Sequence, residues 1–131
     1  MDEFRVLVTG SRNWSVPAKV HLVLTSVYCD IVGLGKQMVL VEGECPDSPD
    51  EYSVDWADQM IAMGFSVVVD PHPADWEKFG RGAGYRRNAE MVKLGADICL
   101  AFIHNESKGA SHTAALADKA AIRTVVFEEN S

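Results

Sequence analysis

The chain alternates short apolar runs with longer segments of helical periodicity, and this alternation constrains the fold more than any other feature. The apolar runs cover residues 4–9, 37–41, 65–70, 98–103 and 122–127. Continuous apolar strands are buried on both faces, which is typical of a parallel sheet between two helical layers. With right-handed crossovers, the pattern predicts one α/β domain over residues 1–131, a Rossmann-like three-layer sandwich with five parallel strands in the order 3-2-1-4-5.

Four segments between the apolar runs have the periodicity or the end signals of helices. Apolar residues recur at three- and four-residue steps from Pro17 to Ile31, where Gly33 follows. Ser48 and Pro49 have the form of an N-cap with proline in the first helical position. We expect the remaining helices at about 84–94 and, after a polar loop HNESKGASHT, in an alanine-rich segment to about 120; the last four residues, EENS, are expected to be frayed.

Composition excludes several classes of protein. The formal net charge of −7 argues against a broad nucleic-acid binder, because such binding needs many cations facing the phosphates. No apolar run approaches the ~20 residues of a spanning helix. Cys29, Cys45 and Cys99 are odd in number and follow no ligand spacing, so reduced thiols are predicted. We therefore expect a cytoplasmic protein without membrane contact, metal or cofactor.

The predicted strand order places a ligand site at the carboxyl ends of the first and fourth strands, where the order reverses. Six of the 12 Lys and Arg residues fall in the loops at this edge. Such a concentration of positive charge in an acidic protein predicts anion binding, and solvated surface charge is the alternative. The candidate ligand-binding residues are Gly10, Ser11, Arg12, Trp14, Gly43, Arg86, Arg87, Asn88, Ser107, Lys108, Gly109 and Ser111.

Several of these candidates have a second interpretation. Trp14 either stacks on a base or covers the start of a helix. Arg86 either contacts the ligand or pairs with Glu90 four residues later. Ser107 or Ser111 either faces a phosphate or caps its helix. The nearby aromatics Trp76 and Phe79 are interpreted as packing anchors rather than ligand contacts.

Three stretches resemble a known family. They are RVLVTGSRNW near the start, PADWEKFGRGAGYRRNAEMV in the middle, and ADICLAF with SKGASHT near the end. They are similar to the YspA-like group of small proteins, often encoded by phages, in the SMF/DprA-LOG superfamily. The resemblance covers nearly the whole chain. It implies a Rossmann-like fold, binding of a nucleotide or nucleotide-derived small molecule, and a homodimer.

The chain also departs from these relatives. Enzymes of the LOG type carry a PGGxGTxxE motif, and ESKGASHT takes its place here, with Gly109 matching but Thr113 standing where the glutamate would be. Because this glutamate is missing, a sensor or sequestering protein is favoured over an enzyme of the LOG type. The alternative is a phosphoribohydrolase or N-glycosidase that uses Glu90 or Glu106 as the carboxylate. A further departure is the segment 42–58, which carries seven acids.

Overall fold

Helices and strands alternate along the whole chain in the computed structural model, which describes residues 2–105 and 107–130. The elements are β1 (Glu3–Gly10), α1 (Pro17–Gly33), β2 (Gln37–Glu42), α2 (Pro49–Ala62), β3 (Val67–Pro71), α3 (Trp76–Phe79), a 3-10 turn η1 (Gly80–Gly82), α4 (Ala83–Leu94), β4 (Ile98–His104), α5 (Lys108–Lys119) and β5 (Arg123–Glu129).

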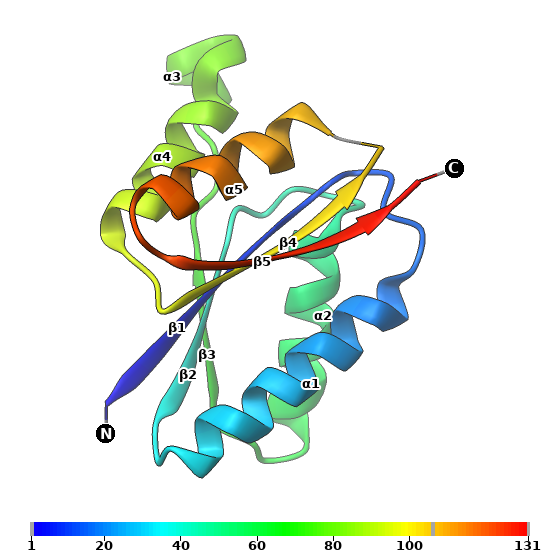
Figure 1. Cartoon of the computed structure of the whole chain (residues 1–131), viewed down its shortest axis with the longest axis vertical. Helices are drawn as coiled ribbons and strands as arrows, with labels where there is room; N and C mark the ends of the chain where they lie inside the picture. The colour runs from blue at the N-terminus through cyan, green and yellow to red at the C-terminus, as the bar shows by residue number, and fades with distance from the viewer. Residues whose placement is uncertain (1, 106, 131) are drawn as a thin grey trace.

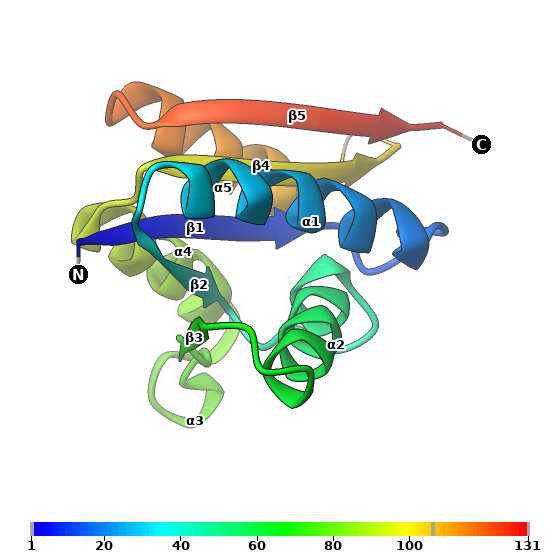
Figure 2. The same cartoon turned by 90° about the horizontal axis from the view of Figure 1, so that it is seen from below.

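The strands form one parallel sheet in the order β3-β2-β1-β4-β5, which confirms the predicted fold class. Helices α1 and α2 cover one face, and α4 and α5 cover the other (Figure 1). The short α3 lies beside α4, away from β4 and β5 (Figure 2). All four strand pairs are parallel, so every strand ends at the same edge of the sheet. The direction in which the strands are added reverses between β1 and β4.

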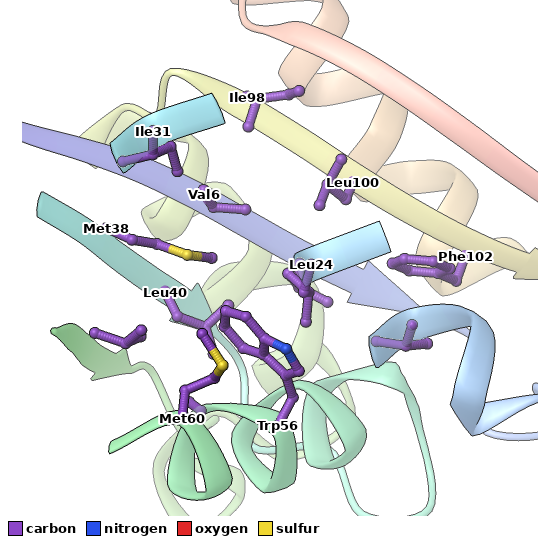
Figure 3. Packing of buried hydrophobic residues seen from close by; sticks show 14 of the residues in the cluster. Val6, Leu24, Ile31, Met38, Leu40, Trp56, Met60, Ile98, Leu100 and Phe102 are labelled. Carbon is purple, nitrogen blue, oxygen red and sulfur yellow. The ribbon is translucent and has the colours of Figure 1, made fainter. Parts of the chain in front are cut away.

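The core has two main layers because successive strand residues face opposite sides of the sheet. Val6 and Val8 belong to one buried cluster with Trp56. Figure 3 shows Val6 and Trp56 in this layer, under α1 and α2. Leu7, between them in sequence, packs with Met91 of α4 in the other layer. Burying a side chain of this size contributes roughly 1.5–3 kcal/mol, so both faces of the sheet need their helices.

The structure corrects three expectations about where helices and strands occur. Glu128 and Glu129 lie in β5, not in a frayed tail. The last helix begins already at Lys108, so most of SKGASHT is helical. Its N-cap, Ser107, makes no side-chain capping hydrogen bond to a described residue. The segment before α4, expected to be a loop, contains α3 and a 3-10 turn, with Asp75 Oδ1 accepting from the backbone N–H of Lys78 at 3.0 Å.

Two glycines at the end of α1 should respond to alanine in opposite directions. Gly33 is helical and an added Cβ would meet nothing within 4 Å, so Gly33→Ala should stabilise the protein by about 0.5–1 kcal/mol. Gly35 has a φ of +70°, which L-residues adopt at a cost, so Gly35→Ala should destabilise by about 1 kcal/mol. Urea unfolding of both variants checks the prediction, and effects of the same sign would contradict it.

Candidate functional site

The loop after β1 is bound to its neighbours rather than open at the switch point. A Cβ on Gly10 would lie 2.7 Å from both Cβ and Cδ of Pro49, so α2 begins directly against this glycine. Ser11 is 2% exposed; its N–H donates to the Phe102 carbonyl at 2.9 Å, and its Oγ accepts from the His104 N–H at 2.8 Å. Gly10 and Ser11 thus join β1, α2 and β4, and neither residue is among those that line the cationic hollow described below.

Trp14 is buried, with 5% of its surface exposed. Its indole Nε1 donates to the Val16 carbonyl at 2.8 Å, and its ring meets Phe102 edge-on at a centroid distance of 5.4 Å. Of the two interpretations from the sequence, these contacts favour the one in which Trp14 covers the start of α1.

The end of β5 is fastened to the same edge by Glu129. Its Oε1 accepts from the Ser15 N–H at 2.6 Å and lies 2.9 Å from Nδ1 of His104, while its Oε2 accepts from the Ser15 hydroxyl at 2.8 Å. Desolvation alone would raise the pKa of Glu129, but these hydrogen bonds and the electrostatic effect of His104 together lower it. The carboxylate therefore ties the last strand to the loop after the first.

Arg87 is held in a fixed position at the carboxyl end of β2. Its Nη1 donates to the Gly43 carbonyl, and its Nε donates to Oδ1 of Asn88 at 2.7 Å. A Cβ on Gly43 would lie 2.6 Å from Cζ of the guanidinium, so a side chain at this position would displace Arg87. Asn88 is 7% exposed and so acts as the support of Arg87. In the described part of the chain, Nη2 of Arg87 has no acceptor.

Arg12 and Arg87 line one hollow of about 230 Å³. Arg12 is exposed, with Nε 3.4 Å from Sγ of Cys45. Trp76, which is 55% exposed, forms another part of the wall. A Cβ on Gly84 would lie 3.3 Å from Cη2 of Trp76 and 3.8 Å from Nη2 of Arg87, so the indole and the guanidinium flank one point. The remaining lining residues are Gly43, Glu44, Cys45, Pro46, Pro73 and Ala74.

Two buried carboxyl groups lie behind this hollow. Glu42 is 1% exposed and desolvation, with some repulsion from Asp50 and Glu44, raises its pKa to about 7. Asp50 is 5% exposed and desolvation raises its pKa to about 6. Its Oδ2 accepts from the Cys45 N–H at 3.2 Å. Arg87 lowers the pKa of both groups, but burial outweighs it.

The start of α5 lies at the same edge but outside the hollow. Tyr85 of α4 meets His112 of α5 edge-on at 4.8 Å between ring centroids, so the first turns of the two helices are neighbours. Thr113 is fully buried and its Oγ1 donates to the Gly109 carbonyl at 3.3 Å. None of the candidates on this helix lines the 230 Å³ hollow; they are Ser107, Lys108, Gly109 and Ser111.

The other arginines of the middle stretch are separate from the hollow. The guanidinium of Arg86 lies 4.3 Å from the ring centroid of Phe79, and the described residues show no ion pair between it and Glu90. Arg81 is exposed in the 3-10 turn. Of the two candidate catalytic carboxylates, Glu90 is exposed on α4 and Glu106 lies outside the described residues.

Sequence reasoning missed two features of this edge. Trp76 had been interpreted as a packing anchor, whereas its side chain is largely exposed beside two arginines. Glu42 had been counted only among the seven acids of segment 42–58, whereas it is buried at the end of β2. The available signal was position, because a charged residue that directly follows the apolar run MVLV continues a buried strand.

A larger hollow in the structure has a different lining. An apolar hollow of about 470 Å³ lies under α1, lined by residues such as Val27 and Phe127, and lacks the pair of arginines.

Within residues 2–105 and 107–130, no group of three or more His, Cys, Asp or Glu side chains could hold a metal ion. Over the same residues, no helix combines the length and apolar character needed to cross a bilayer.

The comparisons with known proteins found one curated relative of nearly equal length. The chain is 40% identical over 124 residues to the Gene 61 protein of Mycobacterium phage D29, and the match covers 94% of this chain and 95% of that protein. This similarity supports a phage origin. No protein-family model matches the chain, and no solved structure matches it.

Proposed function

The chain belongs to the family of the Gene 61 protein of Mycobacterium phage D29, and we propose that it binds a nucleotide or nucleotide-derived small molecule at the carboxyl edge of its sheet. The observation that carries the proposal is the hollow in which two guanidinium groups, from Arg12 and Arg87, stand beside the exposed indole of Trp76. Cations and an aromatic face are the two kinds of group that a phosphate joined to a base requires.

The phosphate is assigned to the two arginines. Arg87 is already oriented by Asn88 and the Gly43 carbonyl, so little side-chain entropy is lost when its Nη2 binds an oxygen. Arg12 is exposed and supplies a second donor from the loop after β1. In a protein with a net charge of −7, this local pair is the reason to expect an anion here.

The base or another flat group is assigned to Trp76 rather than to Trp14, which is buried. At about 230 Å³ the hollow is smaller than a typical drug-sized site. We therefore assign the phosphate and sugar to the hollow and the base to its rim, over the indole. The start of α5, with Lys108 and Gly109, offers a second anion position at the same edge for a ligand with two phosphates.

We further propose membership of the YspA-like group of the SMF/DprA-LOG superfamily, with a sensing or sequestering role and a homodimeric state. The parallel sheet with the order 3-2-1-4-5 is consistent with this assignment. Binding is preferred to glycosidic-bond cleavage because the LOG-type carboxylate position is Thr113, whose hydroxyl is fully buried and donates to the backbone of its own helix.

The test is calorimetric titration with AMP, GMP, CMP, UMP and ADP-ribose. For whichever ligand binds, Arg12→Ala and Trp76→Ala should each weaken affinity at least about tenfold, equivalent to about 1.4 kcal/mol. Arg81→Ala is the matched control, because it removes the same charge from an exposed position and should leave affinity unchanged. Trp76→Phe should retain most of the affinity, because it keeps an aromatic face.

Two results would contradict the proposal. One is the absence of binding to every member of the panel, and the other is equal affinity in the Arg12→Ala, Trp76→Ala and Arg81→Ala variants. Chromatography of the same mixtures for free base distinguishes the roles, since release of base would make the enzymatic alternative the correct one.

A further inference from the structure

A second hollow lies on the other side of the 43–46 loop, between α2 and β3. Its volume is about 370 Å³. Among the residues that the structure describes, its walls carry three carboxyl groups, from Glu42, Glu44 and Glu51, and no Lys or Arg side chain. The other lining residues are Cys45, Pro46, Val54, Val69 and Pro71. The lining is therefore a mixture of apolar and acidic side chains.

Glu42 gives this hollow a built polar group rather than surface charge alone. The side chain is 1% exposed, and its Oε2 accepts from the Glu44 N–H. Its Oε1 is fully buried and has no hydrogen-bond partner in the described part of the chain. A buried acceptor without a donor is costly for a protein to keep, so its presence in the wall of a hollow points to a ligand that donates to it.

The sequence around the hollow reinforces this conclusion. From residue 37 to residue 77 there is no Lys or Arg, while ten residues are Asp or Glu. The cation that acts on Glu42 is Arg87, which comes from α4 and is engaged by the Gly43 carbonyl and Asn88. The segments that line the hollow therefore supply no Lys or Arg side chain to balance its carboxyl groups.

We propose that the hollow between α2 and β3 binds a guanidinium or ammonium group, with Glu42 as its hydrogen-bonded carboxylate partner. The apolar walls formed by Val54, Val69 and Pro71 contact the alkyl part of such a ligand, and Glu44 and Glu51 attract its charge at the rim. The two hollows share Glu44, Cys45 and Pro46 of the loop between them, but the cation site does not depend on the proposed nucleotide site. A phosphate is disfavoured here because three carboxyl groups would repel it.

Binding at this site must be linked to pH. Burial, Asp50 and Glu44 raise the pKa of Glu42 to about 7, while the Glu44 N–H and Arg87 act in the opposite direction. A bound cation favours the ionised carboxyl, so binding releases a proton when Glu42 begins protonated. For one group with this pKa, affinity should fall about tenfold between pH 8 and pH 6.

The probes are agmatine, as a free small cation, and the peptide acetyl-Gly-Arg-Gly-amide, as a model of an arginine side chain on a protein. Calorimetric titration at constant ionic strength should detect binding of at least one probe, weakening about tenfold from pH 8 to pH 6. Measurements in two buffers of different ionisation enthalpy should show proton release near pH 7. Binding of agmatine alone or of the peptide alone identifies the source of the group, and either outcome supports the site.

Variants separate this site from general attraction to an acidic surface. Glu42→Gln should abolish both the binding and its pH dependence while the far-ultraviolet circular dichroism spectrum stays unchanged. Asp118→Asn, which removes one exposed carboxylate from α5, should bind as the unaltered protein does. Failure of both probes to bind at pH 8 overturns the proposal, and so does equal affinity of the Glu42→Gln and Asp118→Asn variants.

Discussion

Replacing Glu42 by Gln should make the protein more stable at pH 8, raising its melting temperature by on the order of 5–10 °C. The reason is the cost of an ionised carboxyl that is 1% exposed, whose pKa burial raises to about 7. Gln keeps an oxygen to accept from the Glu44 N–H but carries no charge. The gain in the free energy of unfolding is roughly 2–3 kcal/mol.

The sign of the pH dependence follows from the direction of the shift. Between the ordinary pKa of 4.5 and about 7, the folded protein binds a proton at Glu42 more tightly than the unfolded chain does. The free energy of unfolding therefore falls as pH rises through this window, and the raised pKa of Asp50, about 6, adds to the fall. Below pH 4.5 the contribution of protonated Glu42 is fully present.

Thermal melts from pH 5 to pH 8 check this prediction. The difference between Glu42→Gln and the unaltered protein should be small at pH 5 and largest at pH 8. Glu51→Gln is the matched control, since it makes the same chemical change at an exposed position and should alter stability by less than about 0.5 kcal/mol. A Glu42→Gln variant with a lower melting temperature than the unaltered protein at pH 8 would contradict the prediction.

Replacing Gly10 by Ala should destabilise the protein by about 3 kcal/mol. The added Cβ would lie 2.7 Å from two ring carbons of Pro49, and a proline ring at the first position of a helix cannot rotate away. The strand end or the start of α2 must shift, and both belong to the joint at the carboxyl edge. Urea unfolding measures the loss directly.

Two further variants make the Gly10 test specific. Gly109→Ala places the same methyl group in open space on helix α5, so it should leave stability unchanged or raise it by up to about 1 kcal/mol. Pro49→Gly removes the opposing ring, so combining it with Gly10→Ala should lose less stability than the sum of the two single changes. Strict additivity would mean that the clash with Pro49 is not the cause.

The fold was predictable from the sequence because its main determinant is local. Runs such as MVLV and CLAF mark strands buried on both faces, and a parallel sheet with right-handed crossovers leaves few strand orders. The end of β5 was missed because Glu128 and Glu129 look like a polar tail. Glu129 pairs with His104 of β4, and its side chain accepts two bonds from Ser15, 114 residues earlier; no local pattern contains these contacts.

The sequence predicted where the candidate site lies, but not all of the residues that form it. Strand order alone puts Arg12, Gly43 and Arg87 at one edge, and the structure brings all three to one hollow. Whether a tryptophan packs or stays exposed depends on the neighbouring elements, and Trp14 and Trp76 turned out differently for that reason. Burial of Glu42 likewise comes from α2 and β3 closing over the end of β2.

The carboxylate of Glu129 also has a consequence for how the protein is made. Ser15 leaves the ribosome 114 residues before Glu129, the residue whose carboxylate fastens its loop. During synthesis this loop must therefore wait for β5. We therefore expect nascent chains that end before β5 to hold a formed α1–β2–α2 unit while the edge that carries Arg12 is still unset.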